Sequence, residues 1–432
     1  VLLSYDTNIL SPACMSASRK DFETAKELAA SSPDKAVAIY SGILDSTGNS
    51  TDDIKVKEQT ITNLGELYAK LGKAEELSGL LKRVRPFFNV VPKAKTAKIV
   101  RTLIDKVAAV PGKTDIIIRL IMECIEWTKE GKRTFLRQRL ELKLAASYFI
   151  TKRYQEALKL ISRLVVEVKK LDDKALLVEI FLLESRIQHA LSHLPKARAS
   201  LTAGRTAANA IYCPPLLQAQ IDLQSGTLHA EERDYKTGYS YFYEAFEALS
   251  TLNDPSAVQT LKYMLLCKIM TKQTTDITNI ISGKLALKYD GKDLQAMKAI
   301  AAAYKKRSIK VLQGALAEYN AELSEDAIIT RHLKDLYDNL LEQNLAKIVE
   351  PYSEVEISHL AKLIELPIAD VERKLSQMIL DHKLSGILDQ GRDCLIVFED
   401  KPADSTYTDA INTIADVSNV VDSLYKKAAK VM

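Results

Sequence analysis

The sequence predicts a mainly α protein: a right-handed α-solenoid of tetratricopeptide-like helical hairpins, then a winged-helix domain and a last helix. Three observations predict this class. Glycine and proline number only 15 and 12 among 432 residues, about half their usual frequency, so few breakers interrupt long helices. Hairpin signals recur about every 40 residues. Near the C-terminus, two short amphipathic segments precede two apolar segments around a tight turn.

The repeat is marked by small or apolar residues that follow a turn. The steps between these points are 41, 80, 40 and 41 residues, and the long step spans two periods with a weak copy near Ile117. The points are Ala36, Leu77, Ala157, Ala197 and Gly238. A constant period indicates a solenoid in which each hairpin buries its apolar stripe on its neighbours. Because the period exceeds the 34 residues of a standard tetratricopeptide repeat, we expect longer helices.

Individual helices carry their own signals. Within residues 135–149, apolar residues recur every four positions between arginines and lysines: Leu136, Leu140, Leu144 and Tyr148. This spacing predicts one buried helix face. Asp172 and Asp173 should cap the helix that follows them. Pro214 and Pro215 should end one helix and start the next.

Residues 353–400 have the order of a winged helix. Ser353 and Glu356 form a capping-box pattern before a stripe of Ile357, Leu360 and Ile364. A second helix carries Val371, Leu375, Met378 and Ile379 on one face, and residues 387–388 and 394–398 read as two strands. The second helix mixes acidic with basic residues, which disfavours nucleic-acid binding.

We expect residues 394–398 to form the outer strand of this domain. The strand consists of Cys394, Leu395, Ile396, Val397 and Phe398. It either packs on its own helices or adds an edge to a partner's sheet.

The segment from Thr406 onward predicts one last helix. Its apolar and small residues alternate steps of four and three, which is a coiled-coil seam. They are Tyr407, Ile411, Ile414, Ser418, Val421, Tyr425 and Ala428. Such a helix either folds back on its own chain or joins a bundle with other chains.

The charge is balanced, with 60 basic and 56 acidic residues and a net charge of +4. This surface is not a nucleic-acid footprint. One stretch is strongly basic: Lys82, Arg83, Arg85, Lys93, Lys95 and Lys98. It is either a solvated face or a surface that docks an acidic partner.

Other features restrict the protein's class. Five cysteines are scattered without a Cys-x-x-Cys pair, which indicates a reducing compartment, cytosol or nucleus. No apolar run reaches the roughly 18 residues that span a membrane. We expect residues 1–14 to be an extension outside the fold, because Met15 opens a typical start.

No constellation of residues points to catalysis. Residues 111–114 lack the first glycine of a phosphate-binding loop. His189 and His193 have the spacing of a metal pair but no evident third ligand. A Gly-x-Ser-x-Gly nucleophile motif is missing. We therefore expect no enzyme activity, no cofactor and no metal.

Several segments resemble a known family. LYDNLLEQNL, IVEPYS, DVERKLSQMILD and GILDQG resemble the PCI domain of proteasome lid subunits, and KRTFLRQ, RYQEAL and NAIYCPP are similar to one lid subunit in particular. The similarity covers roughly Lys55 to Lys427. Pro367 departs from the family pattern, which tends to place Ser there as a helix cap. The resemblance implies a solenoid over 15–290, a PCI domain over 291–400 with its winged helix at 353–400, and a bundle helix over 404–432.

The resemblance also implies a function. It implies a non-catalytic scaffold of the regulatory particle lid, in cytoplasm and nucleus, that serves ubiquitin-dependent protein degradation. Its implied partners are other lid PCI subunits, an ATPase-ring subunit and an α-ring subunit of the core particle, which the solenoid would clamp together. A paralogous scaffold of the cullin-deneddylating signalosome and a PCI subunit of a translation-initiation complex are the alternatives. IYCPP and LLEQNL favour the proteasome.

Overall fold

The computed structural model describes residues 17–45, 51–89, 91–108, 114–271, 273–289, 291–320, 323, 326–364, 366–389, 391–398 and 406–431. The expected extension over residues 1–14 lies outside this range. The chain divides into two compact units, Val1–Ala257 and Val258–Met432. Each unit is described by itself.

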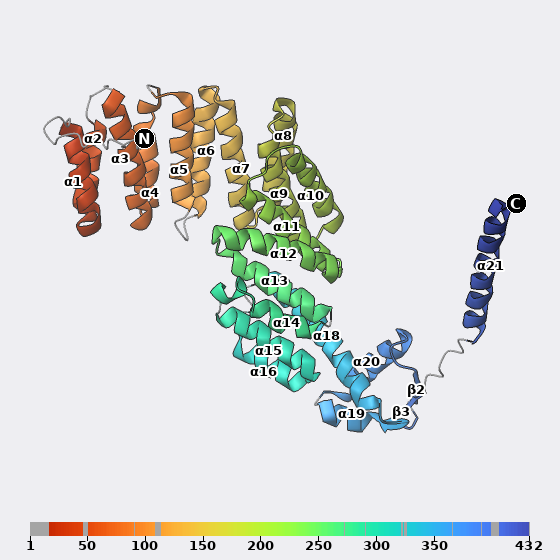
Figure 1. Cartoon of the computed structure of the whole chain (residues 1–432). Coiled ribbons are helices and arrows are strands. Elements are labelled where there is room, and N and C mark those ends of the chain that lie inside the picture. The colour runs from red at the N-terminus through yellow and green to blue at the C-terminus, as the bar shows by residue number, and fades with distance from the viewer. Residues whose placement is uncertain are drawn as a thin grey trace, which may run out of the picture. The chain divides into compact units, whose positions relative to one another are not determined.

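Unit 1 is a row of helices, and each one packs on the next along the chain (Figure 1). Alternate helices also touch, for example α7 with α9 and α9 with α11. The helices are α1 (Ala17–Ser31), α2 (Pro33–Asp45), α3 (Thr51–Lys70), α4 (Ala74–Val84), α5 (Lys93–Ala108), α6 (Thr114–Glu130), α7 (Thr134–Ile150), α8 (Tyr154–Leu171), α9 (Lys174–Ala190), α10 (Leu194–Asn209), α11 (Pro215–Glu231) and α12 (Tyr235–Leu252), with a 3-10 turn η2 (Phe87–Asn89) after α4. One connected core runs from Ala25 to Ile187. The predicted helical solenoid is confirmed.

The 40-residue step has a simple structural origin. Every marker residue is the fourth residue of the second helix of its hairpin, in α2, α4, α8, α10 and α12. Ala36, Leu77, Ala157 and Ala197 are completely buried there. Ile117, the weak copy, is the fourth residue of α6 and is buried too. The pattern therefore marks the point, one turn into each second helix, where the hairpin closes on its core.

The turn before each second helix is also repeated. Gly72, Lys152, Ser192 and Arg233 lie five residues before a marker and have positive φ angles of 69°, 60°, 61° and 65°. In the second of these turns, the N–H of Arg153 donates to the carbonyl of Tyr148 at 2.9 Å. The same bond recurs in the other three turns. This is the Schellman motif, whose left-handed residue is usually glycine; three of these four turns accept another residue.

Small residues mark close helix approaches in unit 1. A Cβ atom on Gly65 of α3 would lie 2.5 Å from Leu103 Cδ2 of α5. A Cβ atom on Gly226 of α11 would lie 2.7 Å from the Phe242 ring of α12. The expected caps are confirmed as well. Asp173 accepts a hydrogen bond from the N–H of Leu176 at 3.2 Å, and Pro215 opens α11.

Unit 2 continues with helices and ends in a small sheet. Its elements are α13 (Ser256–Met270), which begins just before the boundary, α14 (Thr274–Ile281), η3 (Ala286–Tyr289), α15 (Lys292–Lys306), α16 (Ile309–Glu318), α18 (Ala327–Val349), β1 (Glu354–Glu356), α19 (Ile357–Ile364), α20 (Ile368–Leu380), β2 (Gly386–Asp389), β3 (Cys394–Val397) and α21 (Thr406–Val431). The predicted stripes on α19 and α20 are buried, with Leu360 and Leu375 completely inaccessible. Pro367 stands at the N-cap of α20 without a side-chain hydrogen bond.

The sheet corrects two expectations. Its strand order is β1-β3-β2, and both pairings are antiparallel. The strand Cys394–Val397 is therefore central, and the expectation that it is the outer strand is wrong. The capping box is wrong as well, because Glu354–Glu356 pairs with residues 394–396 and the helix begins only at Ile357. Val355 alone of these three is buried, so the alternation suits a strand better than a cap.

Candidate interaction surfaces

The basic stretch between Lys82 and Lys98 is partly neutralised by neighbouring helices. The Nζ atom of Lys82 lies 3.0 Å from an Oε2 atom of Glu123 on α6, and Arg85 lies 3.9 Å from the same oxygen. Lys95 on α5 contacts Glu58 on α3 at 3.1 Å. These three cations therefore link helices of the stack. Sequence reasoning could not foresee this, because each carboxylate is about 40 residues from its partner.

Two other lysines of the stretch have free side chains. Lys93 and Lys98 lie in the first two turns of α5, and both are exposed. No carboxylate in the described part of the chain lies within ion-pair distance of either. Arg83, near the end of α4, is exposed as well. The part of the stretch that a partner can reach is therefore smaller than the sequence predicts.

Strand β3 offers little surface of its own. Cys394 and Leu395 are buried, Ile396 and Val397 are half-buried, and only Phe398, just past the strand, is 49% exposed. Both sides of β3 are hydrogen-bonded within the domain. The free edges of this sheet belong to β1 and β2.

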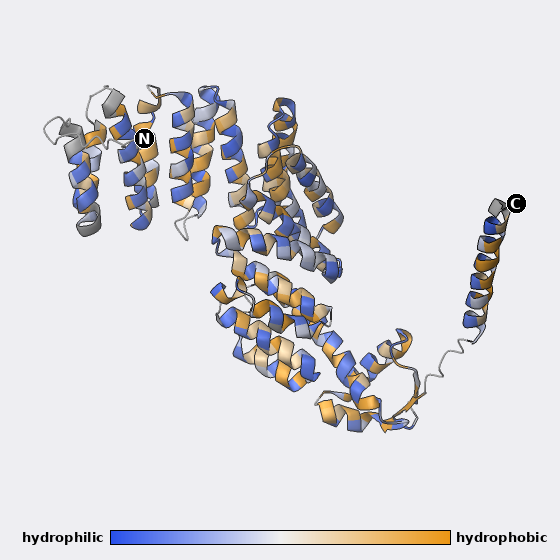
Figure 2. Ribbon diagram, in the orientation of Figure 1, coloured by the Kyte–Doolittle hydropathy of each residue, from blue (hydrophilic) through white to orange (hydrophobic). Residues whose placement is uncertain are grey.

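The last helix exposes its predicted seam. Tyr407 is 78% exposed, Ile411 65%, Ile414 69%, Val421 57% and Tyr425 75%. Figure 2 shows apolar residues recurring along α21 among hydrophilic ones. Sequence reasoning missed Val417, Val420 and Leu424, which are equally exposed. Val417 and Leu424 are seven residues apart, so a heptad count could have found that they widen the apolar face.

The second helix of the winged helix is tied down by ion pairs. Lys374 on α20 reaches Glu342 on α18 at 2.9 Å, and Lys383 reaches the same carboxylate at 2.7 Å. Burial raises the pKa of Glu342, but hydrogen bonds from Lys383 and Lys374 outweigh it, so the pKa is lowered. Arg373 pairs with Asp370 at 3.4 Å. With these cations engaged inside the domain, the helix is poorly suited to read phosphates.

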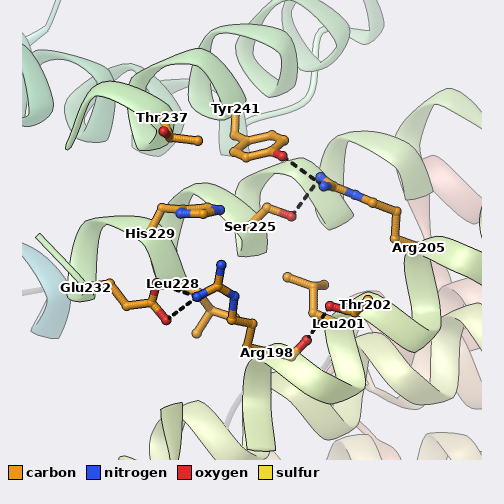
Figure 3. Close-up of a pocket in the computed structure, with 10 residues that line it drawn as sticks. All are labelled: Arg198, Leu201, Thr202, Arg205, Ser225, Leu228, His229, Glu232, Thr237 and Tyr241. Carbon is orange, nitrogen blue, oxygen red and sulfur yellow. Dashed lines mark hydrogen bonds and ion pairs between the residues drawn. The ribbon is translucent and has the colours of Figure 1, made fainter. Parts of the chain in front are cut away.

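A hollow of about 310 Å³ lies between α10, α11 and α12 (Figure 3). Its charged groups bind one another. Arg198 reaches Glu232 at 2.9 Å, and Arg205 donates to Tyr241 Oη at 2.9 Å and to Ser225 Oγ at 3.1 Å. Burial raises the pKa of Asp222, which also contacts Arg205. The hollow is thus closed by hairpin packing, and its charged groups are satisfied without a ligand.

The groups that could carry chemistry are buried or paired. Burial raises the pKa of the Cys124 thiol to about 11 and that of Cys267 to about 12, so neither is a thiolate at neutral pH. His189 lies 3.3 Å from Glu231, a structural pair between α9 and α11. The described residues hold no group of three side chains that could bind a metal ion. Among those residues, no helix is long and apolar enough to cross a membrane.

Comparisons with known proteins identify the family. Residues 18–151 match the model of the 26S proteasome regulatory subunit RPN6 N-terminal domain, residues 316–399 match the PCI domain, and residues 403–429 match the RPN6 C-terminal helix domain. The chain is 57% identical over 398 residues to the 26S proteasome non-ATPase regulatory subunit 11 homolog of Arabidopsis thaliana, which covers 92% of this chain and 95% of that protein.

Two further relatives agree. The 26S proteasome non-ATPase regulatory subunit 11 of Dictyostelium discoideum is 52% identical, with 92% of this chain and 95% of that protein covered. The 26S proteasome regulatory subunit RPN6 of Saccharomyces cerevisiae is 43% identical, with 91% and 94% covered. The paired helices, the PCI domain and the last helix all fall where these models match. The chain therefore belongs to the family of 26S proteasome non-ATPase regulatory subunit 11, also named RPN6.

Proposed function

We propose that this chain is a non-catalytic scaffold subunit of the proteasome regulatory particle lid, acting in cytoplasm and nucleus. The observation that carries the proposal is the joint match to the RPN6 N-terminal domain, the PCI domain and the RPN6 C-terminal helix. The names of the relatives do not favour a signalosome or translation-initiation subunit. The satisfied charges and buried thiols described above support a role in binding rather than in catalysis.

Each part of the chain is proposed to hold a different partner. The solenoid over residues 15–290 contacts an ATPase-ring subunit and an α-ring subunit of the core particle. The PCI domain over 291–400 stands beside other lid PCI subunits. The helix over 404–432 joins a helical bundle shared by lid subunits. Residues 1–14 are proposed to be an extension that takes no part in these contacts.

The last helix provides the sharper test of this proposal. Ile411→Asp with Ile414→Asp places two charges on the exposed seam, where burial in a bundle would be costly. Asn412→Asp with Asn419→Asp places the same two charges on the opposite face of α21 and is the matched control. In cells, the first variant should lose co-purification with proteasome subunits identified by mass spectrometry, and the control should keep it. Equal recovery by both variants would contradict the bundle.

The basic stretch provides the second test. Lys93→Glu with Lys98→Glu reverses the two cations that lack a described ion-pair partner. Lys159→Glu with Lys170→Glu, on exposed positions of α8, changes the net charge equally. The first variant should weaken association of the regulatory particle with the core particle at low salt and have little effect at high salt, where charges are screened. An unchanged affinity at every salt concentration would remove this surface from the proposal.

A further inference from the structure

A groove runs across alternate helices of unit 1. One hollow of about 370 Å³ is lined from α5, α7 and α9, and a second of about 460 Å³ is lined from α7, α9 and the start of α11. Leu142, Lys143 and Glu179 line both. The two hollows therefore join into one open groove along the first helices of successive hairpins.

The groove carries more positive than negative charge. Its cations are Lys98, Arg101, Arg139, Lys143 and Arg186, and its carboxylates are Asp105 and Glu179. Lys143 forms an ion pair with Asp105. Among the described residues, no carboxylate lies within ion-pair distance of the three arginines. The Nε–H of Arg101 donates only to the carbonyl of Ala97, at 3.2 Å.

Arg186 is the most informative of these cations. It lies on α9 and lines the second hollow. Burial lowers the pKa of its guanidinium, and no neighbouring charge counteracts this shift. A partly buried guanidinium without a carboxylate partner is unfavourable, and an anionic ligand would relieve it. The free protein thus leaves a cation exposed to the groove that its own chain does not neutralise.

The α11 end of the groove is apolar. Leu182 and Leu183 form its floor, and Leu216, 42% exposed, stands at its rim beside Leu217. With helix axes about 8–10 Å apart, four helices in a row cover roughly 25–30 Å. An extended chain of about eight or nine residues spans that distance.

We propose that this groove binds an extended acidic peptide segment of a partner protein, which places an apolar side chain at the α11 end. The unpaired arginines supply the charge complementarity, and the leucines supply the anchor. A nucleic acid fits less well, because Glu179 and Asp105 lie in the middle of the groove and would face its closely spaced phosphates. This site goes beyond the scaffold role proposed above, since it uses neither the Lys93–Lys98 surface nor α21.

The test uses the full-length protein and a fluorescein-labelled peptide of about nine residues, rich in glutamate, with Leu-Phe at one end. Fluorescence anisotropy measures binding at low and at physiological salt. The variant Arg101→Gln, Arg139→Gln, Arg186→Gln should bind about tenfold more weakly at low salt. The control Lys159→Gln, Lys170→Gln, Lys196→Gln removes equal charge from α8 and α10 and should bind like the unchanged protein. Replacing Leu-Phe by Ser-Ser in the peptide should weaken binding several-fold.

The proposal fails if the arginine variant binds as well as the unchanged protein, or if both variants lose equal affinity. It also fails if a single-stranded oligonucleotide of the same charge displaces the peptide more effectively than the unlabelled peptide does. Circular dichroism checks that each variant is folded. If the arginine variant does not fold, Arg101→Gln with Arg139→Gln, which leaves the buried Arg186 intact, should still weaken binding about threefold.

Discussion

Gly226 on α11 tests the close packing of a hairpin. A Cβ atom built there would lie 2.7 and 2.8 Å from two carbons of the Phe242 ring and 3.0 Å from a third. Phe242 is 1% exposed, so its ring has little room to withdraw. Gly226→Ala should therefore overpack the contact between α11 and α12.

The expected magnitude follows from two opposing effects. Overpacking a core costs about 1–3 kcal/mol, and the very short contacts place this site near the upper end of that range. Replacing glycine by alanine inside a helix returns about 0.8–1 kcal/mol. The net loss should be about 1–2 kcal/mol. For a unit of this size, each kcal/mol corresponds to a fall in Tm of about 2–4 °C.

Gly79→Ala on α4 is the matched control. A Cβ atom there meets nothing within 4 Å, so only the gain in helix propensity remains and stability should rise by about 0.5–1 kcal/mol. The difference between the two variants isolates the steric effect, at about 2–3 kcal/mol. Scanning calorimetry of the full chain measures both, and hydrogen exchange of α11 and α12 shows whether the loss is local, as expected of a repeat protein.

Phe242→Leu supplies a second check. It removes ring atoms that would touch the new methyl group, so it should restore part of the stability when combined with Gly226→Ala. If Gly226→Ala proves as stable as the unchanged chain, or if Gly79→Ala loses just as much, the packing argument is wrong.

Three further predictions address other links in the structure. Lys152→Gly should stabilise unit 1 by about 0.5–1 kcal/mol, because Lys152 has a left-handed φ of 60°, and Gly72→Ala at φ 69° should destabilise it by about 1 kcal/mol; both are read by calorimetry, and opposite signs would refute the turn argument. Glu342 has a lowered pKa, so its contribution to stability is present above its unfolded pKa and is lost as pH falls through the folded pKa. Glu342→Gln should cost about 1–3 kcal/mol near pH 7 and flatten the acid dependence of unit 2 unfolding, and an unchanged acid profile would contradict this. Ile411→Asp should leave the thermal unfolding of the isolated chain unchanged, since Ile411 is 65% exposed, and a large loss would mean that α21 packs on its own chain.

Local signals in the sequence predicted much of the helical fold. The spacing of Ala36, Leu77 and Ala157 indicated the hairpin period, because every second helix buries its fourth residue. The caps at Asp173 and Pro215 were readable from residue chemistry alone. The seam on α21 was predicted for the same reason, since a 3.6-residue turn places Tyr407, Ile411 and their successors on one face.

The candidate surfaces were less predictable, because they depend on neighbours far along the chain. Lys82 and Lys95 look free in the sequence, yet Glu123 and Glu58 pair with them. Arg186 carries no local signal that it lines a groove.

The sequence by itself determined that this chain is a stack of helical hairpins with a winged helix and an amphipathic last helix, because periodicity, caps and turns act over a few residues. Only the tertiary structure decided which strand is central. Residues 394–397 look the same whether they pair on one side or on two, and β1 was hidden within a pattern that also suits a helix cap. The tertiary structure also decided which cations are neutralised and which line the groove, because side chains about 40 residues apart meet only once the helices have stacked.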